Sequence, residues 1–419
     1  MIRTTFESIV IDPSVEETPL AVAVRRNAGA TEVISAPTAG FAADTRHVGR
    51  TAGKRFLLVE RFQGHAVKLC QGLKPGYACC NLHTLAEANN CSMECTYCIL
   101  QFYMNSPHLS VFANTMDLQA EILRRVALAS PRLLRIGTGE LSDSLLLDPL
   151  TESTRQMVPF FRRLPNAVLE LKTKTDNIEN LLELGSAGKT VVSWSVNPSE
   201  IVEREELKTA PLRRRLAAAR ALAFQGYPIG FHIDPMIDYL DWQDGYAALV
   251  DALLDAVPPQ QIAWISIGSL RFPPSMKATV ASRFPRSELR YGELVRGADG
   301  KLHYLRPQRI EMYRWVVERL RRQIRDPSQG PVLYLCMESP EVWERVFDEP
   351  APTLEELDFR FAQSFERRFP GPSLETPRWE HYAPRETPEI AEPSGDFVPL
   401  ESVRSFHGKP EAASRPCGG

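Results

Sequence analysis

The sequence predicts an α/β fold in which parallel strands alternate with crossover helices. Short apolar runs alternate about six times, between residues 83 and 267, with longer stretches whose apolar residues recur at helical spacing. The chain has 419 residues, which is enough for one large core, and an α/β barrel of this length need not be divided. We therefore expect a single large α/β unit.

The elements are expected in a regular order along the chain. The lead-in, residues 1–75, is predicted to be a small α/β segment with short strands at Glu7–Ile11, Glu32–Ser35 and Phe56–Phe62. The repeating strands are predicted at His83–Asn90, Leu133–Gly137, Val168–Leu171, Val191–Val196, Ile229–Ile233 and Ile262–Ile267. Helices are predicted after a cap at Asn114 or Thr115 and near Thr151–Arg163, Ile178–Leu184, Leu212–Phe224 and Tyr246–Ala256.

The last part of the chain is predicted to close the fold and then to become disordered. Pro331–Cys336 is expected to add one more strand and Pro340–Phe347 a short helix. Nine prolines and scattered charge fill residues 370–419, a composition typical of disorder. The predicted organisation is thus the lead-in 1–75, a barrel over 76–350 and a C-terminal extension over 351–419.

Composition limits where the protein works and what it binds. The chain has 52 acidic and 49 basic residues, so any nucleic-acid binding must depend on a local basic patch. Eight cysteines in a chain this long do not make a disulfide framework. The first residues lack a basic region followed by a long apolar run, and no apolar stretch reaches membrane-spanning length. We expect a cytoplasmic protein with no membrane partner.

The segment from Asn90 to Leu109 carries the most specific signal. Cys91, Cys95 and Cys98 have the spacing Cys-x3-Cys-x2-Cys. Four-iron clusters are held by cysteine thiolates, and three thiolates leave the fourth iron free to bind a ligand. A structural zinc site needs four ligands, and it remains an alternative if Cys79 or Cys80 joins the three. Disulfides in an oxidising compartment are a further alternative.

This cysteine spacing resembles the radical S-adenosylmethionine (SAM) superfamily. The resemblance implies a 4Fe–4S cluster on Cys91, Cys95 and Cys98, SAM bound at the open iron, and reductive cleavage of SAM to a 5'-deoxyadenosyl radical. It implies that Tyr97 contacts the adenine and that a carrier such as flavodoxin or ferredoxin supplies the electron. The partial (β/α)6 barrel of TIM type found in these enzymes fits six predicted units better than a full eight.

Polar residues follow several predicted strands at the end where barrel enzymes place their active residues. The second strand leads into Gly139 and Glu140, followed by Ser142, and either Glu140 or Ser142 is a candidate acceptor for the SAM ammonium. Lys174 follows the third strand and is a candidate partner for the SAM carboxylate. Ser195 ends the fourth strand and suits the ribose or the carboxylate. A tight turn with solvated polar residues is the structural alternative after the second strand, and a solvated lysine is the alternative for Lys174.

A closer resemblance is to the spore photoproduct lyase family, and it covers residues 90–324. It rests on the runs LKTKTDNIENLL and VVSWSVNPSEIVEREE, on Leu100-Gln101 after the cysteines, and on the RLAAAR segment at residues 215–220. The resemblance implies cleavage of a carbon–carbon bond in a thymine adduct of DNA, with DNA as the partner. It also implies the cluster on the three cysteines and SAM contacts near Ser142, Lys174 and Ser195.

Two positions depart from that family. Its cysteine hydrogen donor corresponds to Glu140 here, and the tyrosine after its third cluster cysteine is replaced by Ile99. Glu140 restores a glycine-and-glutamate SAM motif of the superfamily, so Tyr97 and Glu140 are the candidate catalytic residues. Cys336 is a candidate replacement donor, with a structural role as the alternative. A different nucleotide or a small molecule is therefore the first alternative substrate, and a non-catalytic zinc or iron–sulfur protein that binds nucleic acid is the second alternative.

Residues 291–305 are predicted to form a β-hairpin turning at Asp299-Gly300. In the lyase family a hairpin at this place inserts beside the lesion, which makes Arg296 and Tyr304 tentative substrate contacts. Arginines at 213–215 and 319–325 are candidate phosphate contacts. Solvated helix faces explain the same arginines equally well.

Overall fold

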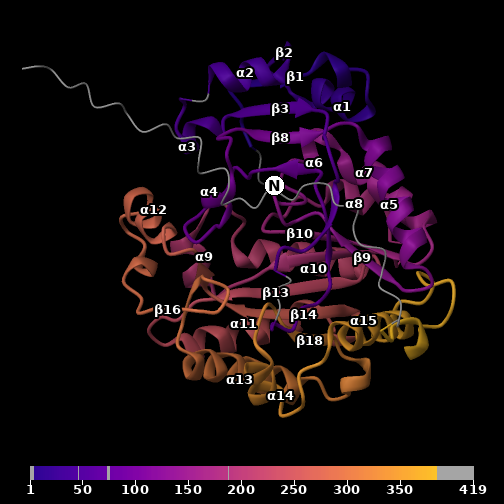
Figure 1. Cartoon of the computed structure of the whole chain (residues 1–419), viewed down its shortest axis with the longest axis vertical. Helices are drawn as coiled ribbons and strands as arrows, with labels where there is room; N and C mark the ends of the chain where they lie inside the picture. Colours follow the sequence, from indigo (N-terminus) through magenta and orange to yellow (C-terminus); the bar gives the residue numbers. More distant parts are fainter. Residues whose placement is uncertain (1–3, 46, 73–75, 187, 385–419) are drawn as a thin grey trace, which may run out of the picture. The chain divides into compact units, whose positions relative to one another are not determined.

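An eight-stranded sheet, in the order β18-β14-β13-β11-β10-β9-β5-β4, forms the centre of the molecule (Figure 1). A computed structural model describes residues 4–45, 47–72, 76–186 and 188–384. The strands that pair in parallel are β5 (His83–Leu85), β9 (Leu134–Gly137), β10 (Ala167–Thr173), β11 (Thr190–Ser195), β13 (Ile229–Met236), β14 (Ile262–Ser269) and β18 (Val332–Leu335). At one edge β4 (Val67–Leu69) pairs antiparallel with β5.

Helices follow the parallel strands and confirm the predicted α/β alternation. They are α5 (Thr115–Ala129), α7 (Ser153–Arg163), α8 (Glu179–Leu184), α10 (Leu212–Phe224), α11 (Trp242–Ala256) and α13 (Arg306–Gln323). The alanine-rich composition of α10 favours a helix, and its buried residues, among them Leu216, Ala219 and Leu222, recur at helical spacing. The strand predicted at residues 331–336 is β18, which extends the curved sheet beyond the six predicted units.

The first predicted barrel strand is wrong in length. Only His83–Leu85 belongs to the barrel sheet, while β6 (Ala88–Asn89) joins a second sheet by pairing antiparallel with β8 (Leu109–Phe112). The chain turns between the two strands, where the backbone NH of Glu87 bonds to the carbonyl of Leu85 at 3.2 Å. The apolar pattern alone does not show this change of partner, because each half of the run pairs with a different sheet.

The second sheet has the order β2-β1-β3-β8-β6 and confirms the three strands predicted in the lead-in. These are β1 (Ser8–Ile11), β2 (Glu32–Ser35) and β3 (Phe56–Glu60). The sheet continues past residue 75, because β6 and β8 flank the cysteine segment in the sequence. The lead-in therefore shares a sheet with the two strands that hold the cysteine loop at its ends.

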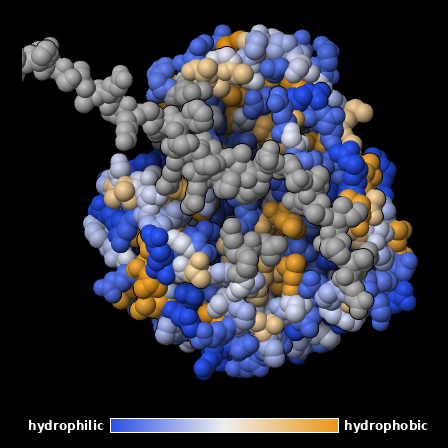
Figure 2. Space-filling model, viewed as in Figure 1, coloured by the Kyte–Doolittle hydropathy of each residue, from blue (hydrophilic) through white to orange (hydrophobic). Residues whose placement is uncertain are grey.

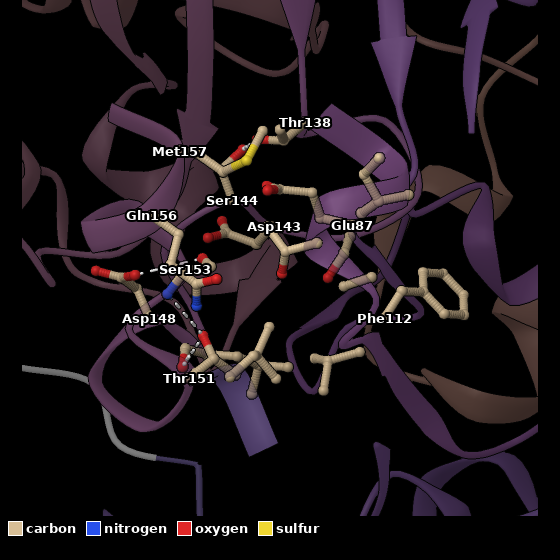
Figure 3. Close-up of a pocket in the computed structure, with 17 residues that line it drawn as sticks. Glu87, Phe112, Thr138, Asp143, Ser144, Asp148, Thr151, Ser153, Gln156 and Met157 are labelled. Atoms are coloured by element: carbon tan, nitrogen blue, oxygen red, sulfur yellow. Dashed lines mark hydrogen bonds between the residues drawn. The ribbon is translucent and has the colours of Figure 1, made fainter. Parts of the chain in front are cut away.

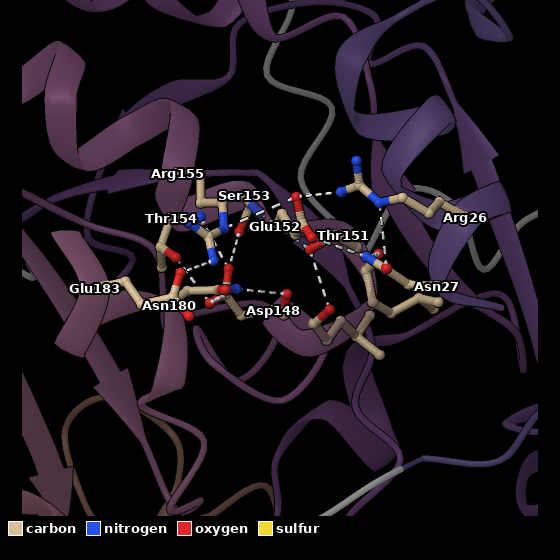
Figure 4. Close-up of polar contacts among 12 residues, drawn as sticks. Arg26, Asn27, Asp148, Thr151, Glu152, Ser153, Thr154, Arg155, Asn180 and Glu183 are labelled. Carbon is tan, nitrogen blue, oxygen red and sulfur yellow. Dashed lines mark hydrogen bonds and ion pairs between the residues drawn. The ribbon is translucent and has the colours of Figure 1, made fainter. Parts of the chain in front are cut away.

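Polar contacts fix this second sheet to the barrel (Figure 4). In α1 (Pro19–Asn27), Arg26 pairs with Glu152 at 2.6 Å, and the Asn27 amide donates to the same carboxylate at 3.1 Å. On the barrel side, the Asp148 carboxylate accepts from the Thr154 backbone NH at 2.9 Å and from its hydroxyl at 2.7 Å. These bonds satisfy free NH groups in the first turn of α7 and hold the loop that faces α1.

A buried ion pair lies inside the barrel. Glu170 on β10 is 2% exposed and accepts hydrogen bonds from Ser193 at 2.7 Å, Trp264 at 2.9 Å and His232 at 2.8 Å. Arg135 on β9 lies 3.5 Å from its second oxygen. Burial acts to raise the pKa of Glu170, but the contacts with His232, Arg135 and Ser193 outweigh it and lower the pKa below the ordinary value of 4.5. Glu170 is therefore a buried carboxylate that links four strands.

The chain segments at the two ends of the curved sheet meet each other. The NH of Ala78, ahead of β5, bonds to the carbonyl of Glu338, after β18, at 2.8 Å. Helix α15 (Leu354–Arg368) adds Phe361, whose ring centroid lies 6.0 Å from that of Trp264. The Arg135 guanidinium lies 3.9 Å from the Phe361 centroid, a cation–π contact. Together these contacts cover the open side of the partial barrel.

The disorder predicted from about residue 370 begins too early. The Leu374 NH bonds to the Asn166 side chain at 2.7 Å. Tyr382 is 1% exposed, and its hydroxyl accepts a 2.9 Å bond from the Leu133 NH. A buried aromatic ring anchors this proline-rich segment, which composition alone does not reveal. Residues 385–419, including Cys417, lie outside the described residues.

The face of the molecule seen in Figure 2 is mostly hydrophilic. Figure 2 shows hydrophilic residues over most of the viewed face, with hydrophobic residues in separate patches. Among the described residues, no helix combines the length and the apolar character needed to cross a membrane.

The Glu170 pair gives a first test. Glu170→Gln leaves Arg135 buried without its counter-charge, and we expect a loss of about 3 kcal/mol of unfolding free energy at pH 7 in urea titrations. Because the folded pKa is lowered, the carboxylate stabilises the wild type above pH 4.5 and loses that effect as the pH falls below it. The difference between variant and wild type should therefore shrink in acid.

Glu183→Gln is the matched control, because its side chain is 64% exposed and pairs with Arg155 at the surface. It should change stability by less than about 0.5 kcal/mol. Equal stability of Glu170→Gln and wild type at neutral pH would contradict a stabilising buried pair.

Candidate active site

The three cysteines lie in a loop that is held from two sides. Cys91 is 9% exposed and Cys95 is 5% exposed. Cys95 belongs to β7 (Glu94–Cys95), which pairs antiparallel with β12 (Glu206–Leu207). Gln101, in α4 (Leu100–Tyr103), donates to the carbonyls of Cys95 at 2.8 Å and Thr96 at 3.2 Å. The loop conformation is therefore set by backbone partners rather than by the cysteine side chains.

The three thiols form one electrostatic group. Burial raises the pKa of Cys91 well above its ordinary value, and a negative charge on Cys98 or Cys95 raises it further. Burial raises the pKa of Cys95 to about 12, with Cys98 again contributing. Three thiolates at this place need a bound positive group, since thiolates are the form that binds metals. A cysteine-held iron–sulfur cluster matches this donor set.

The zinc alternative that adds Cys79 or Cys80 to the three cysteines is not supported. Cys79 donates a hydrogen bond to Cys80, which lowers the pKa of Cys80 to about 6, and the charges on Cys70 and Cys336 act on Cys79. These four thiols form a separate group. Each described cysteine is free, and no set of three or more Cys, His, Asp or Glu side chains within the described ranges is already arranged as a metal site.

A buried carboxylate, Glu206, joins the cysteine loop to the barrel. It is 2% exposed and accepts hydrogen bonds from the Tyr97 hydroxyl and from the Asn197 amide at 3.0 Å. Arg215 lies 2.6 Å from one oxygen and the Lys174 ammonium 3.4 Å from the other. Burial acts to raise the pKa of Glu206, but Arg215 and Lys174 outweigh it and lower the pKa to about 2. Glu206 is therefore ionised at neutral pH.

Sequence reasoning missed Glu206 and Arg215 as residues of the site. Arg215 is 0% exposed and also donates to the carbonyl of Ser195 at 2.8 Å. It was predicted as part of an arginine cluster on a helix face. The RLAAAR segment that begins with Arg215 supports the family resemblance, but no local signal shows that this arginine is buried, because its partners Glu206 and Ser195 lie on β12 and β11.

Tyr97 and Lys174 lie together beside the cysteine loop, as the predicted SAM contacts require. The Lys174 ammonium is 5.6 Å from the centroid of the Tyr97 ring. Their polar ends both point to Glu206, so the lysine already has a counter-charge. Ser195 is 4% exposed at the end of β11. Direct contacts of these three side chains with SAM stay predictions.

The loop after β9 is packed against β10. A Cβ atom at Gly139 would lie 2.7 Å from the Cβ of Lys172, so a larger residue does not fit there. The NH of Ser144 bonds to the carbonyl of Lys172 at 3.1 Å, and its hydroxyl accepts from Thr138 at 2.7 Å. The glycine therefore permits close approach of the neighbouring strand, and a role of Gly139 in SAM binding stays a prediction.

Ser142 lines a cavity beside the loop that follows β9. Figure 3 shows this cavity, with Glu87, Asp143 and Ser144 among the labelled lining residues. It is 7% exposed, and its hydroxyl has no hydrogen-bond partner among the described residues. Glu87 lines the same cavity, and burial raises its pKa to about 8. Asp143 is held by the Lys174 NH and the Thr173 hydroxyl, both at 2.7 Å. Ser142 thus has a free hydroxyl, which suits the predicted contact with the SAM ammonium.

Charged residues and a thiol meet at the carboxyl ends of the strands. Lys172 lies two residues after Glu170 and so shares its inward face. Burial acts to lower the pKa of Lys172, but Asp234 and Glu140 outweigh it and raise the pKa. Arg271 lies 3.5 Å from Asp234 and 3.3 Å from the sulfur of Cys336. We call Glu140, Lys172, Asp234, Arg271 and Cys336 the mouth cluster.

The predicted hairpin is confirmed, but one of its two candidate contacts is placed elsewhere. Strands β16 (Val295–Arg296) and β17 (Leu302–His303) pair antiparallel, and Gly300 in the turn has a φ of 77°. Arg296 is exposed. Tyr304 is 5% exposed, and its hydroxyl accepts a 3.1 Å bond from the Asp238 NH. Tyr304 is therefore not available for stacking at the outer surface of the hairpin.

The arginine clusters predicted as possible phosphate contacts are largely paired within the chain. The arginines concerned are Arg214, Arg215, Arg319 and Arg322, and their carboxylate partners are Asp176, Glu206, Asp251 and Glu318. Paired cations attract phosphates less than free ones do, so these helices do not provide the local basic patch that DNA binding requires.

Residues 78–318 match the family model described as spore photoproduct lyase. The chain belongs to the spore photoproduct lyase family. Among curated members, it is 28% identical over 215 residues to the spore photoproduct lyase of Bacillus subtilis (strain 168), which covers 50% of this chain and 63% of that protein. It is 29% identical over 218 residues to the spore photoproduct lyase of Geobacillus sp. (strain Y412MC61). This match covers 51% of this chain and 64% of that protein. The matches thus span less than two thirds of these relatives.

Solved structures of the same family share the fold. A mutant spore photoproduct lyase with bound AdoMet and dinucleoside spore photoproduct superposes with a TM-score of 0.68 at 22% identity, covering 79% of this chain and 99% of that chain. A spore photoproduct lyase complexed with dinucleoside spore photoproduct gives a TM-score of 0.67 with the same coverage. The predicted partial (β/α)6 barrel is confirmed as the family fold.

The buried ion pair between Arg215 and Glu206 can be tested by mutation of Arg215. Arg215→Ala removes the main counter-charge of Glu206, and we expect a loss of about 4 kcal/mol in unfolding free energy, measured by urea titration of the cluster-free protein. Arg213→Ala, two residues away and exposed, should change stability by less than about 0.5 kcal/mol. Equal losses in the two variants would show that burial of the Glu206 pair has no special importance.

Proposed function

We propose that this protein is a radical SAM enzyme that cleaves a carbon–carbon bond of a thymine adduct in DNA. The observation that carries the proposal is the loop with Cys91, Cys95 and Cys98, two of them buried and Cys98 half-buried, beside strand-end residues of a lyase-family barrel. We also propose a cytoplasmic location, which keeps such thiols reduced.

The cysteines would hold a 4Fe–4S cluster, and SAM would bind at its open iron. When bound, the cluster and SAM supply reductive cleavage of the sulfonium to a 5'-deoxyadenosyl radical. The side chains of the protein would hold SAM in position. Glu206 fixes the Tyr97 hydroxyl and the Lys174 ammonium, while Ser142 keeps an unpaired hydroxyl beside the strand end. These residues would orient the adenine, the carboxylate and the ammonium of SAM respectively.

The substrate would enter above the mouth cluster. The solved relatives are described as binding dinucleoside spore photoproduct, and Arg296 on the exposed hairpin is suited to a phosphate contact here. After bond cleavage a product radical must receive a hydrogen atom. Cys336 is the candidate donor, since burial raises its pKa and keeps the thiol protonated, and its sulfur lies among strand-end residues.

A different substrate is the second candidate, and Glu140 favours it. This exposed carboxylate stands where the family has its hydrogen-donor cysteine, and its charge acts on Lys172 and on Lys301 of the hairpin. Glu140, Lys172 and Lys301 could together bind a charged group of the substrate, and the bases of a thymine adduct carry no charged group. Another nucleotide or a small molecule would then replace the DNA lesion.

If the cluster binds to Cys91, Cys95 and Cys98, mutation of these cysteines should affect cluster uptake, whereas mutation of the other group of cysteines should not. Cys95→Ser should abolish iron and sulfide uptake under anaerobic reconstitution, together with 5'-deoxyadenosine formation from SAM, because one ligand of three is lost. Cys70→Ser is the matched control and should retain both, because Cys70 lies with Cys79, Cys80 and Cys336. Zinc bound in place of iron, with no SAM cleavage by wild type, would end the enzymatic proposal.

The substrate assignment predicts opposite effects of two variants. Glu140→Ala should lower the rate of SAM cleavage roughly tenfold with little effect on DNA affinity, whereas Arg296→Ala should lower affinity for adduct-containing DNA several-fold with little effect on SAM cleavage. Deoxyadenosine assays and DNA-binding titrations measure the two effects. Steady deoxyadenosine formation beside unchanged adduct would instead favour the second candidate substrate.

A further inference from the structure

A small opening reaches the cysteine loop from the outer surface. It is lined by the cluster cysteines Cys91 and Cys98 and by Arg50, Lys54 and Arg283. The cations come from α3 (Arg50–Gly53), from the residue after it, and from the end of α12 (Met276–Arg283). Figure 1 shows α3, α4 and α12 on the same side of the molecule. We call this feature the basic opening.

The basic opening carries excess positive charge. Lys54 and Arg283 both pair with Glu94, at 3.4 Å and 2.6 Å. Among the ion pairs of the described residues Arg50 has no carboxylate partner, and its guanidinium donates to the carbonyl of Met104 at 2.8 Å. Burial lowers the pKa of Arg50, and the nearby charge of Arg283 lowers it further. Two of the three cations thus share one carboxylate, Glu94, and the third, Arg50, is exposed.

Arg283 also ties the basic opening to the cysteine loop. Its guanidinium donates to the side chain of Gln101, and Gln101 in turn donates to the carbonyls of Cys95 and Thr96. A contact made at Arg283 therefore acts on the backbone that carries the cluster ligands. The remaining sides of the loop are covered, since β12 pairs along β7 and Glu206 binds Tyr97.

We propose that the basic opening is the docking site of an acidic one-electron carrier of the flavodoxin or ferredoxin class, and the place where the electron enters. The inference rests on the proposed function, because only a cluster on Cys91, Cys95 and Cys98 needs an electron from outside. Cleavage of one SAM consumes one electron, which the carrier supplies by passing from its reduced to its oxidised form. A positive rim attracts an acidic partner and accelerates its association.

DNA phosphates are the competing occupant, and the geometry favours the carrier. The basic opening is lined by Cys91 and Cys98, whereas the mouth cluster and the hairpin lie at the carboxyl ends of β10, β13, β14 and β18. A carrier needs proximity to the cluster ligands, while a DNA substrate needs access to the mouth. The same cations therefore suit the electron donor better than the substrate.

Arg50→Glu tests the proposal because Arg50 is exposed and, within the part of the chain that the structure describes, its side chain donates only to the backbone carbonyl of Met104. The affinity of the protein for flavodoxin, measured by calorimetry at low and high salt, should fall roughly tenfold or more, and its salt dependence should weaken. Cluster reduction by flavodoxin, followed by absorbance, should slow in parallel. Reduction by photoreduced deazaflavin, a small reductant that needs no docking site, should be unchanged.

Arg367→Glu is the matched control, since it makes the same charge change at the end of α15, which Figure 1 shows well away from α3 and α4. It should leave flavodoxin affinity within about twofold of wild type, because salt screens the attraction between charges that are far apart. Unchanged flavodoxin binding by Arg50→Glu, or an equal loss in Arg367→Glu, would overturn the proposal. So would a loss of DNA affinity with flavodoxin binding intact, which would assign the basic opening to DNA.

Failure of the proposed function would be visible separately. If wild-type protein formed no 5'-deoxyadenosine even with deazaflavin as reductant, the radical SAM assignment itself would fail. If deazaflavin supports SAM cleavage by both proteins and only flavodoxin discriminates between wild type and Arg50→Glu, the docking site is established.

Discussion

The arrangement of the candidate site depends on one buried carboxylate, Glu206. Its partners come from the cysteine loop, from the ends of two barrel strands and from a crossover helix, namely Tyr97, Lys174, Asn197 and Arg215. Burying this charge is costly unless each oxygen is paired, so the segments must meet in one arrangement. The pairing of β7 with β12 beside it gives the loop a fixed backbone path. The geometry of the three thiols follows from this link.

The barrel interior contains a second buried carboxylate, Glu170, which is also paired with residues from several strands. Glu170 pairs with Arg135, His232 and Trp264 within the core. Of the mouth cluster, Lys172 and Asp234 lie one inward position beyond Glu170 on β10 and His232 on β13. The buried pair stabilises the strand arrangement, while the residues above it remain open to a ligand. The mouth therefore combines a rigid base with charged and thiol groups from several strands, which is the usual location of chemistry in barrel folds.

Two surfaces of the cysteine loop have different roles in our proposals. The inner side carries Tyr97, which contacts Lys174 and Glu206, and SAM would bind there. The outer side ends in the basic opening at Arg50 and Arg283. Electron supply and substrate chemistry would then use opposite sides of one loop, so that a bound carrier does not obstruct the substrate. Gln101 connects the two sides through the loop backbone.

The sequence by itself determined the α/β alternation, the positions of most strands and helices, the cysteine spacing and the family, because these depend on local periodicity and short motifs. Only the tertiary structure decided that β5 and β6 pair in different sheets, that Tyr304 is buried, that Arg215 belongs to the site, and that Cys79 and Cys80 lie with Cys70 and Cys336. The physical reason is that each depends on a partner far away in the chain. Pairing, burial and charge compensation are properties of the assembled fold, and no single stretch of residues specifies them.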